Sequence, residues 1–327
     1  MSKPVISATQ KARLLAEALP FIRAYHATTL VIRLGGGAMA DQALKEGFAR
    51  DVALLRLVGM NPIVVHGGGW RIDELLRQMG IEIREHRGMR VTDEATLKVV
   101  EMVLDELNQE LVGLINRHGG RAVGLNGQDG RFIRARPVAL APDAGAGSEE
   151  IDLGLVGDVE SIDANIVELL VSRHFIPVIM PIGVGADGTA YHINSDLVAG
   201  QLARALKAEK LILMTNVEGV RDRTGRLAYI LTAAEAEGLL DDGVVERDMR
   251  PRLTASLAAV REGVRSVHII DGGVPSALLL EVLTSEGVGT AVRSDEGAHF
   301  FADSRGYFGA PEREPPAASE GRAEPGL

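Results

Sequence analysis

Short runs of β-branched residues alternate along the chain with longer stretches in which apolar residues recur every three or four positions. The short runs predict strands at 29–34, 62–66, 176–182, 210–215 and 266–270, and the longer stretches predict helices at 45–57, 72–79, 95–116, 196–206, 233–240 and 253–262. Strands that alternate with helices form βαβ units with right-handed crossovers. The pattern therefore predicts a doubly wound α/β protein with a mainly parallel sheet.

A further amphipathic helix precedes the first strand and begins near residue 9. Its apolar positions at helical spacing are Leu14, Leu15, Leu19, Ile22 and Tyr25. Two interpretations fit this pattern. Either the helix packs on its own domain, or it is an arm that joins subunits.

Two other segments depart from the alternation of strands and helices. Residues 131–160 hold short β-like pieces around a loop rich in Gly, Ala and Asp, which suggests a hairpin over a site. Residues 311–327 combine Pro with Glu, Arg, Ala and Gly, a composition that buries little surface, so we expect them to be disordered. The expected organisation is a helical arm at 1–26, one α/β domain at 27–294 and a disordered tail at 295–327.

Composition and charge narrow the function classes. Lys and Arg number 35 against 45 Asp and Glu, a formal charge of −10, which argues against a nucleic-acid surface. No cysteine is present, which excludes a disulfide framework, a thiolate metal site and a cysteine nucleophile. The N-terminal residues lack the apolar core of a secretory signal, and no apolar run reaches the roughly 18 residues of a membrane span. We therefore expect a cytoplasmic protein without a membrane segment.

The 38 glycines among 327 residues exceed the average share of about 7%, and several directly follow predicted strands. Two triplets do so: Gly35, Gly36 and Gly37, and Gly67, Gly68 and Gly69. Glycine at a strand end lets the backbone approach a ligand closely, and the N–H groups of the following helix attract anions. Because ligands bind beyond the carboxyl ends of parallel strands, the triplets predict two bound anionic groups, or one group passed between them. The alternative is that they form tight turns alone.

The common nucleotide-binding motifs are weak or absent. The stretch GVGADG at 183–188 has the G-x-G-x-x-G spacing after a strand, but no helix follows it directly, so a dinucleotide site there is disfavoured. A Walker A motif, H-E-x-x-H and G-x-S-x-G are missing. If the protein uses ATP, it holds the phosphates in another kind of cradle.

Three polar segments are also candidates for a site. Arg90 lies just before a helix start, where its guanidinium either binds a carboxylate in a bidentate pair or remains a surface cation. Asn194 and Asp196 lie at another helix start, where an aspartate often only caps the helix. Residues 214–225 form a polar, hairpin-like loop after a strand.

These pieces, in this order, resemble the amino-acid kinase family, in particular its members that phosphorylate the γ-carboxylate of N-acetylglutamate with MgATP in arginine biosynthesis. The resemblance spans about residues 9–290. Its most specific stretches are FARDVALLRLVGMNPIVVHGGG, RVTDEATLKVVEMVL, GGRAVGLNGQDG, FIPVIMPIGVGADG and HIIDGGVPSALLLEVLTSEGVGT. The resemblance implies a three-layer αβα sandwich whose N-terminal half binds the acylated amino acid and whose C-terminal half binds the nucleotide.

The resemblance also implies roles for single residues. Those implied to bind N-acetylglutamate are His66, Gly67, Gly68, Gly69, Arg90 and Asn194. Those implied at the transferred phosphate and the nucleotide are Gly35, Gly36, Asn216 and Gly219. Arg90 would take the α-carboxylate, and Asp196 would orient two cations around the phosphate. Mg²⁺ would arrive with ATP, since the sequence offers no dedicated carboxylate cage.

The N-terminal helix resembles the arm that links dimers into hexamers in arginine-inhibited members of the family. The arginine site that this implies lies between the helix and a second segment. The residues of that segment are His268, Glu286, Gly287 and Gly289.

The sequence departs from the family pattern around the phosphates. Two lysines of the family are replaced by Arg33 and Arg252, and a glycine pair is replaced by Arg247 and Asp248. Arginine keeps the positive charge, but its wide planar fork is not equivalent to a compact ammonium at a tight phosphate site.

Three functions remain open from the sequence. The first is a kinase of N-acetylglutamate in which Arg33 and Arg252 stabilise the phosphate. The second is an inactive family member that binds N-acetylglutamate or arginine and serves a protein partner, such as an acetyl-amino-acid synthase, as a regulatory or scaffold subunit. The third is a kinase of another acylated amino acid, which Trp70, Arg71 and His192 suggest because they also depart from the family pattern.

Overall fold

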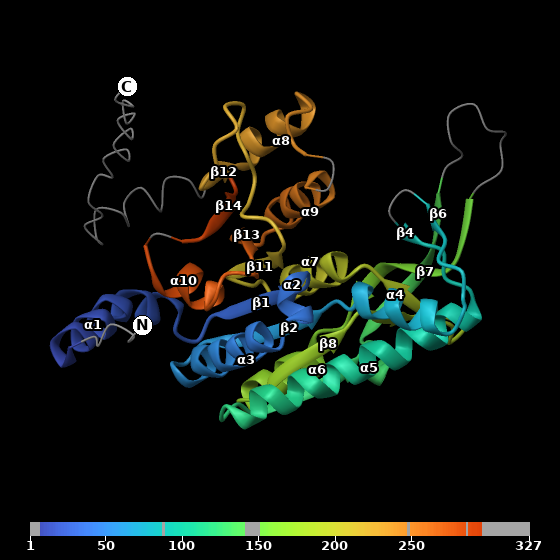
Figure 1. Ribbon diagram of the computed structural model, residues 1–327, viewed down its shortest axis with the longest axis horizontal. Helices are drawn as coiled ribbons and strands as arrows, with labels where there is room; N and C mark the ends of the chain where they lie inside the picture. The colour runs from blue at the N-terminus through green and yellow to red at the C-terminus, as the bar shows by residue number, and fades with distance from the viewer. Residues whose placement is uncertain (1–6, 87–88, 141–150, 247–248, 286, 296–327) are drawn as a thin grey trace, which may run out of the picture.

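An eight-stranded sheet forms the centre of the protein (Figure 1). The computed structural model describes residues 7–86, 89–140, 151–246, 249–285 and 287–295. In spatial order the strands are β12 (Ile230–Thr232), β14 (Gly289–Arg293), β13 (Ser266–Asp271), β11 (Lys210–Thr215), β1 (Thr29–Leu34), β2 (Asn61–His66), β8 (Ile176–Met180) and β5 (Ala122–Asn126). All neighbours are parallel except β13 and β14, which confirms the predicted mainly parallel sheet.

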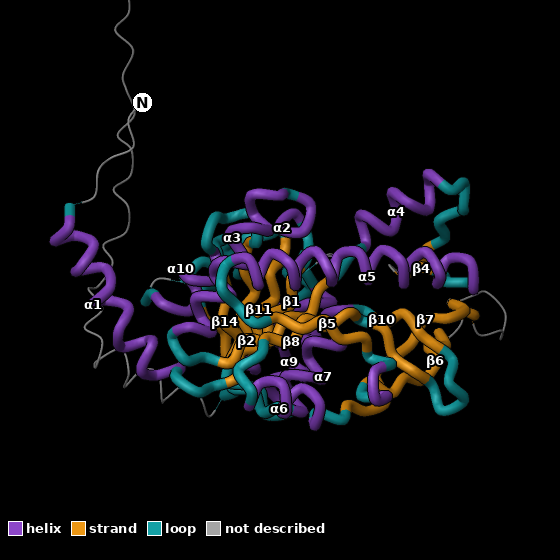
Figure 2. The backbone as a smooth tube through the Cα atoms, turned by 90° about the horizontal axis from the view of Figure 1, so that it is seen from below, coloured by secondary structure: helices purple, strands orange, loops and turns teal. Residues whose placement is uncertain are grey.

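Helices cover both faces of this sheet, as Figure 2 shows. One face carries α2 (Gly37–Ala40), α3 (Gln42–Leu57), α5 (Glu94–Arg117) and α10 (Ala277–Leu283), with α4 (Gly69–Gln78) packed on α5. The other face carries α6 (Asn165–Ser172), α7 (Ser195–Ala205) and α9 (Arg250–Arg261), with α8 (Ala233–Asp241) beside α9. The fold is therefore a three-layer αβα sandwich, as the resemblance implied.

The central strands are apolar throughout because both of their faces are buried. In β1, Leu30 and Ile32 face the core under α3 and α5, whereas Val31 faces the core under α7 and α9. Alternate residues of a strand point to opposite faces, so one run of apolar residues serves two cores. This explains why short β-branched runs without polar alternation predicted the strands correctly.

A small second sheet lies beyond the end of the central one. Its strands β6 (Ile133–Leu140), β7 (Ile151–Ile162), β9 (Ile182–Val184) and β10 (Ala190–Ile193) close on themselves. Strands β6 and β7 pair antiparallel, which confirms the hairpin predicted at 131–160. The G-x-G-x-x-G stretch is the β9–β10 turn, in which Gly185 N–H donates to Thr189 O at 2.8 Å.

The strand predicted at 176–182 is wrong in one respect. The structure divides it into β8 and β9, with Pro181 between them. Proline has no N–H to donate to a neighbouring strand, so the chain changes sheets at this residue. Two short strands, β3 (Glu85–His86) and β4 (Met89–Arg90), form a separate ladder beside α4.

Helix α1 (Ala8–Tyr25) extends away from the body of the protein (Figures 1 and 2). Its start is fixed by a capping box between Ser7 and Gln10, but none of its residues is fully buried. The side chains of Leu14, Leu15 and Leu19 are 56%, 75% and 53% exposed. The helix contacts the body through α10, so the interpretation that it packs on its own domain is wrong for most of its length.

The expected tail at 295–327 lies almost entirely outside the described residues, as does the loop at 141–150. No helix in the described ranges combines the length and apolarity that crossing a membrane requires.

Candidate functional site

Arg33 lies where the carboxyl ends of β1 and β11 meet the start of α7. Its Nε is 2.7 Å from Asp196 Oδ1 and donates to Ser195 Oγ at 3.1 Å. Its NH1 donates to the carbonyl of Met214 at 3.3 Å. The side chain is 14% exposed, so three partners hold one guanidinium at a partly buried point beyond the strand ends.

The structure corrects the interpretation of Asp196 as the cap of α7. Asn194 is the cap, since its Oδ1 accepts the Asp196 N–H at 2.7 Å. Asp196 lies two residues after this cap, and its carboxylate forms an ion pair with Arg33 instead. The role expected for Asp196, orienting a cation, therefore has a geometric basis for Arg33.

The first glycine triplet borders the same point. Gly36 has φ +67° and directly precedes α2. The N–H of Gly37 donates to Oδ1 of Asn216, the residue that directly follows β11. A Cβ added to Gly35 would lie 1.8 Å from Arg33 NH1. Two glycines thus bring the backbone against Arg33 and Asn216, as a cradle for an anionic group requires.

Gly36 permits a sharp prediction. Alanine there would need a left-handed backbone, and its Cβ would lie 1.9 Å from Asn216 Oδ1. We expect Gly36→Ala to lower the free energy of unfolding by about 1–3 kcal/mol, measured by urea denaturation. Gly69→Ala is the matched control, because a Cβ there meets nothing within 4 Å, and it should stay within about 0.5 kcal/mol of the wild type. Equal losses in both variants would contradict the close approach.

The second glycine triplet follows β2 and faces the first across Arg33. A Cβ on Gly67 would lie 3.5 Å from Ser195 Oγ and 3.8 Å from Arg33 NH2. His66 is fully buried, with Nδ1 2.9 Å from Gly67 O and Nε2 3.2 Å from Asn108 Nδ2. Its ring therefore supports the loop from inside the fold, while Gly68 and Gly69 lead into α4.

Arg90 lies at the end of β4, with its side chain 10% exposed. Its NH1 is 2.5 Å from Asp73 Oδ1 of α4, and its Nε has no hydrogen-bond partner among the described residues. Burial, reinforced by the Arg90 charge, lowers the pKa of His192 to about 4. Arg90 is thus a nearly buried cation with an unused donor, which is not the surface cation of the alternative interpretation.

A cavity of about 520 Å³ opens beside Asn216. Its walls come from the polar loop after β11 and from the segment that precedes α9. Gly219 (φ +151°) allows that loop to pack tightly, because a Cβ there would lie 2.5 Å from Thr290 Oγ1. The loop predicted to border a nucleotide therefore does border a cavity next to the first glycine triplet.

Arg252 is a half-buried residue in the first turn of α9. That helix packs against α7, which carries Asp196. Arg252 is therefore related to Asp196 through the packing of α9 on α7, whereas Arg33 forms an ion pair with Asp196 directly. Arg247 and Asp248 lie outside the described residues.

A second polar cluster is formed by side chains of β11, β13 and α10, namely Lys210, Ser266, His268 and Glu281. Of these residues, only His268 was predicted from the sequence as part of a site. The Nδ1 of His268 is 2.5 Å from Glu281 Oε1, and its Nε2 is 3.0 Å from Lys210 Nζ and 2.9 Å from Ser266 Oγ. The Lys210 ammonium also lies 4.7 Å from the centre of the Tyr25 ring of α1. The neutral ring thus links an ammonium to a carboxylate by donating through Nδ1 and accepting at Nε2.

The segment expected beside His268 is only partly described. Glu286 lies outside the described residues, Gly287 has φ +59° next to Glu281, and Gly289 begins β14. Glu281 was missed because it sits within the apolar run LLLEVL of α10, where the sequence pattern predicts only packing. Lys210 was missed because it reads as the polar flank of a strand.

Three histidines with lowered pKa values make stability depend on pH, of which His66 and His268 are buried and His192 is half-buried. Burial is the largest cause that lowers the pKa of His66, His192 and His268 to about 4, whereas the unfolded value is 6.5. Between these values the unfolded chain binds protons that the fold does not, so stability falls as the pH drops from about 6.5 to 4. Burial raises the pKa of Asp51 to about 6, which has the opposite sign and offsets one histidine.

We therefore expect the free energy of unfolding to fall by about 1.4 kcal/mol per pH unit for each histidine that is not offset. Urea denaturation at pH 7, 6 and 5 measures this fall. His192→Gln should reduce the slope, and the exposed His118→Gln should not. A free energy that is constant from pH 6.5 to 4.5 would contradict this account of the buried rings.

Among the described residues, no three His, Asp or Glu side chains lie close enough together to hold a metal ion.

Comparison of the sequence and the fold with known proteins identifies the family of this chain. A sequence model of the amino acid kinase family matches residues 28–271. The chain is 57% identical to the acetylglutamate kinase of Chromobacterium violaceum over 288 residues, which are 88% of this chain and 99% of that protein.

Two solved structures of N-acetylglutamate synthase from Neisseria gonorrhoeae share the fold. The complex with coenzyme A and N-acetylglutamate has a TM-score of 0.77 at 26% identity over 86% of this chain, which spans 63% of the synthase chain. The complex with coenzyme A and L-arginine has a TM-score of 0.72 at 25% identity over 86% of this chain and 65% of the synthase chain. Together with the sequence matches, these structures show that the chain belongs to the amino acid kinase family.

Proposed function

We propose that this protein is an acetylglutamate kinase, which transfers the γ-phosphoryl group of ATP to the γ-carboxylate of N-acetyl-L-glutamate in arginine biosynthesis. The observation that carries the proposal is the Arg33–Asp196 pair, held between two glycine loops at the carboxyl ends of β1 and β2. The high identity to a curated acetylglutamate kinase, over nearly all of its length, supports the same activity.

The reaction is a displacement at phosphorus. A γ-carboxylate oxygen of the acceptor attacks the γ-phosphorus of ATP, the bond to the β,γ-bridging oxygen breaks, and ADP leaves with that electron pair. Such transfers depend on positioning and on cations that neutralise charge on the equatorial oxygens. In our proposal Arg33 and Arg252 supply that charge, and Asp196 fixes the orientation of Arg33.

The C-terminal half holds the nucleotide in this proposal. Asn216 and Gly219 line the 520 Å³ cavity, and Asn216 connects it to the first glycine triplet by accepting a hydrogen bond from Gly37 N–H. A Cβ at Gly36 would fill the cradle, so the site fits a phosphate group that needs close backbone approach. Mg²⁺ would be held mainly by oxygens of ATP, where it would neutralise charge on the phosphates.

The N-terminal half holds the acceptor. Gly67, Gly68 and Gly69 face the γ-carboxylate, and Asn194 lies at the edge of the same site. Arg90 takes the α-carboxylate, because it is a nearly buried guanidinium with a free Nε and guanidinium groups bind carboxylates in bidentate pairs. His66 acts by holding the Gly67 loop.

A measurement of ADP release tests this proposal. With MgATP and N-acetylglutamate the protein should release ADP at a rate that saturates with acceptor concentration. Glutamate, which lacks the acyl group, and N-acetylaspartate, which is one methylene shorter, are the matched controls. ADP release that is equal with and without N-acetylglutamate would refute the proposed activity.

One observation favours a second candidate, an inactive member of the family that binds N-acetylglutamate or arginine for a protein partner. The Arg33 guanidinium already has three protein partners: Asp196, Ser195 and Met214. A guanidinium in that state leaves fewer donors for a phosphate than a free cation. Saturable binding of N-acetylglutamate by calorimetry without any ADP release would favour this candidate.

We also propose that arginine is an effector of this protein. The support is the Lys210–His268–Glu281 cluster, which joins α1, β11, β13 and α10 near Gly287 and Gly289, and a related synthase has been solved with L-arginine. The Glu281 carboxylate, whose pKa is held low in part by its hydrogen bond to His268, is a fitting partner for a guanidinium.

Helix α1 is the proposed arm of a homo-oligomer, in the arrangement of a hexamer formed from dimers. Its exposed leucines provide the apolar surface that a second copy would cover. Removal of residues 1–26 should convert the oligomer to dimers, measured by light scattering after size exclusion. Replacing only Leu14, Leu15 and Leu19 with serine is the milder version of the same change. A truncated protein with the wild-type mass per particle would reject the arm.

A further inference from the structure

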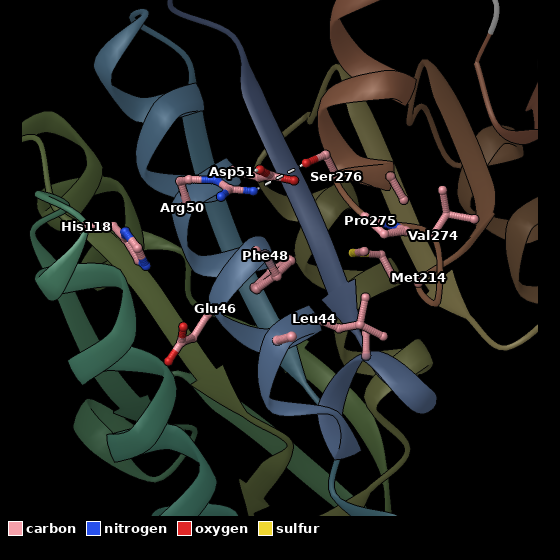
Figure 3. Close-up of a pocket in the computed structure, with 15 residues that line it drawn as sticks. Leu44, Glu46, Phe48, Arg50, Asp51, His118, Met214, Val274, Pro275 and Ser276 are labelled. Carbon is pink, nitrogen blue, oxygen red and sulfur yellow. Dashed lines mark hydrogen bonds and ion pairs between the residues drawn. The ribbon is translucent and has the colours of Figure 1, made fainter. Parts of the chain in front are cut away.

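A second cavity, of about 270 Å³, lies between α3, α10 and the end of β11 (Figure 3). Its floor is buried and includes Ala38, Phe48 and Met214, and its mouth opens at exposed residues such as Glu46 and His118. No residue that lines this second cavity also lines the cavity beside Asn216, although both cavities lie near the end of β11. None of the residues Lys210, His268 and Glu281 lines this second cavity.

Asp51 points into this second cavity from α3, toward Ser276. Its side chain is 1% exposed, and its Oδ1 has no hydrogen-bond partner among the described residues. The nearest cation is Arg50, whose Nε is 3.8 Å away, beyond hydrogen-bond reach. The Arg50 guanidinium is 62% exposed, and its NH2 donates weakly to Ser276 Oγ at 3.5 Å.

A buried carboxylate without N–H or O–H donors is unfavourable, and a structure that keeps one usually supplies the donors from a ligand, ion or water. The groups around Asp51 do not supply them. Burial raises the pKa of Asp51 to about 6, and Arg50 lowers that value only in part. A donor group of positive charge therefore fits the cavity better than a neutral or anionic one.

We propose that this cavity binds a small aliphatic cation, an alkylammonium or alkylguanidinium ion, with its charged head on Asp51 and its stem against Phe48 and Met214. Two carboxylates, Asp51 and Glu46, line the cavity against one guanidinium, that of Arg50, and this balance favours a cation. The volume of 270 Å³ is just below the range of about 300–1,000 Å³ for drug-sized ligands, which limits the occupant to a head group and a short stem. The proposal does not rest on the proposed kinase activity. Of the residues that hold Arg33, only Met214 also lines the cavity, and Met214 binds Arg33 through its backbone carbonyl.

The location gives such a ligand two neighbours of interest. Ala38 belongs to α2, which directly follows the Gly35–Gly36 loop, and Ala277 begins α10, which carries Glu281. A bound cation would thus touch both the helix beside the proposed phosphate cradle and the helix of the proposed effector cluster.

The test is a titration of the full-length protein at pH 7.5 with n-butylammonium chloride, followed by isothermal calorimetry and by the NMR signal of the Asp51 carboxyl carbon. Butylguanidinium is the second arm, and n-butanol is the uncharged control of the same length. Two variants complete the design. Asp51→Asn removes the charge without changing the shape, and Ala43→Trp narrows the exposed mouth and leaves Asp51 in place.

We expect saturable binding of at least one of the two cations, accompanied by a shift of the Asp51 carboxyl-carbon signal. Affinity should drop about 10-fold or more in Asp51→Asn and in Ala43→Trp, and n-butanol should bind at least that much more weakly. The proposal is overturned if butanol and butylammonium bind equally, if Asp51→Asn binds as well as the wild type, or if neither cation shifts the Asp51 signal. The last result would mean that Arg50 folds onto Asp51 and closes the site. If Asp51→Asn does not fold, Ala43→Trp and the Asp51 signal decide the question.

Discussion

Replacing Arg33 with methionine is expected to lower the turnover number for N-acetylglutamate phosphorylation by about 10²- to 10³-fold, because one well-aimed donor to a developing charge contributes that much. Methionine has a similar length but no charge, so Asp196 also loses its partner. The steady-state rate of ADP release at saturating N-acetylglutamate and ATP measures the effect.

Three variants control this experiment. Arg33→Lys keeps the charge as a compact ammonium and should retain more activity than Arg33→Met. Asp196→Asn should lower turnover with Arg33 still present, because it removes the group that orients the guanidinium. The exposed Arg77→Met should leave turnover unchanged. Wild-type turnover in Arg33→Met would remove Arg33 from the reaction.

The second large effect is expected at the acceptor site. Arg90→Met should raise the KM for N-acetylglutamate by about 10- to 100-fold, because a charge-assisted bidentate pair contributes roughly 1.5–3 kcal/mol. The turnover number should change less than the KM, since the α-carboxylate is remote from the reacting γ-carboxylate and is held equally before and during the reaction. Initial rates over a range of N-acetylglutamate concentrations separate the two constants.

Arg84→Met is the matched control. Arg84 is an exposed arginine whose NH2 lies 4.0 Å from Asp93 Oδ2, so it also has a carboxylate neighbour. Asp73→Asn tests the positioning of Arg90 by its ion pair. Removing that carboxylate should change the KM in the same assay without a large change in turnover. If Arg90→Met leaves the KM for N-acetylglutamate unchanged, the α-carboxylate binds elsewhere.

The sequence predicted the fold well where burial on both sides of the sheet dominates. Strands β1 and β11 begin and end at the predicted residues, because apolar β-branched runs between turns have few alternative structures. The division at Pro181 was missed because the apolar run continues across it. Local pattern predicts a strand, but only the tertiary structure decides which sheet it joins.

The site was predicted less completely, because its contacts join residues that are distant in the sequence. The ion pair between Arg33 and Asp196 spans 163 positions, and local rules favoured Asp196 as a helix cap. Glu281 shows the same limit. Its carboxylate faces His268 from within an apolar helix, and no periodicity distinguishes it from a solvent-exposed residue.

The central claim is that a γ-carboxylate receives a phosphoryl group at Arg33. Its most direct measurement uses hydroxylamine, which converts an acyl phosphate to a stable hydroxamate and does not react with the free carboxylate under the same conditions. The protein is incubated with MgATP, N-acetylglutamate and hydroxylamine, and the product is quantified by mass spectrometry. We predict N-acetylglutamyl-γ-hydroxamate in molar proportion to ADP for the wild type and at least 100-fold less for Arg33→Met. Hydroxamate no higher than in a sample without protein, while N-acetylglutamate still binds, would contradict the account.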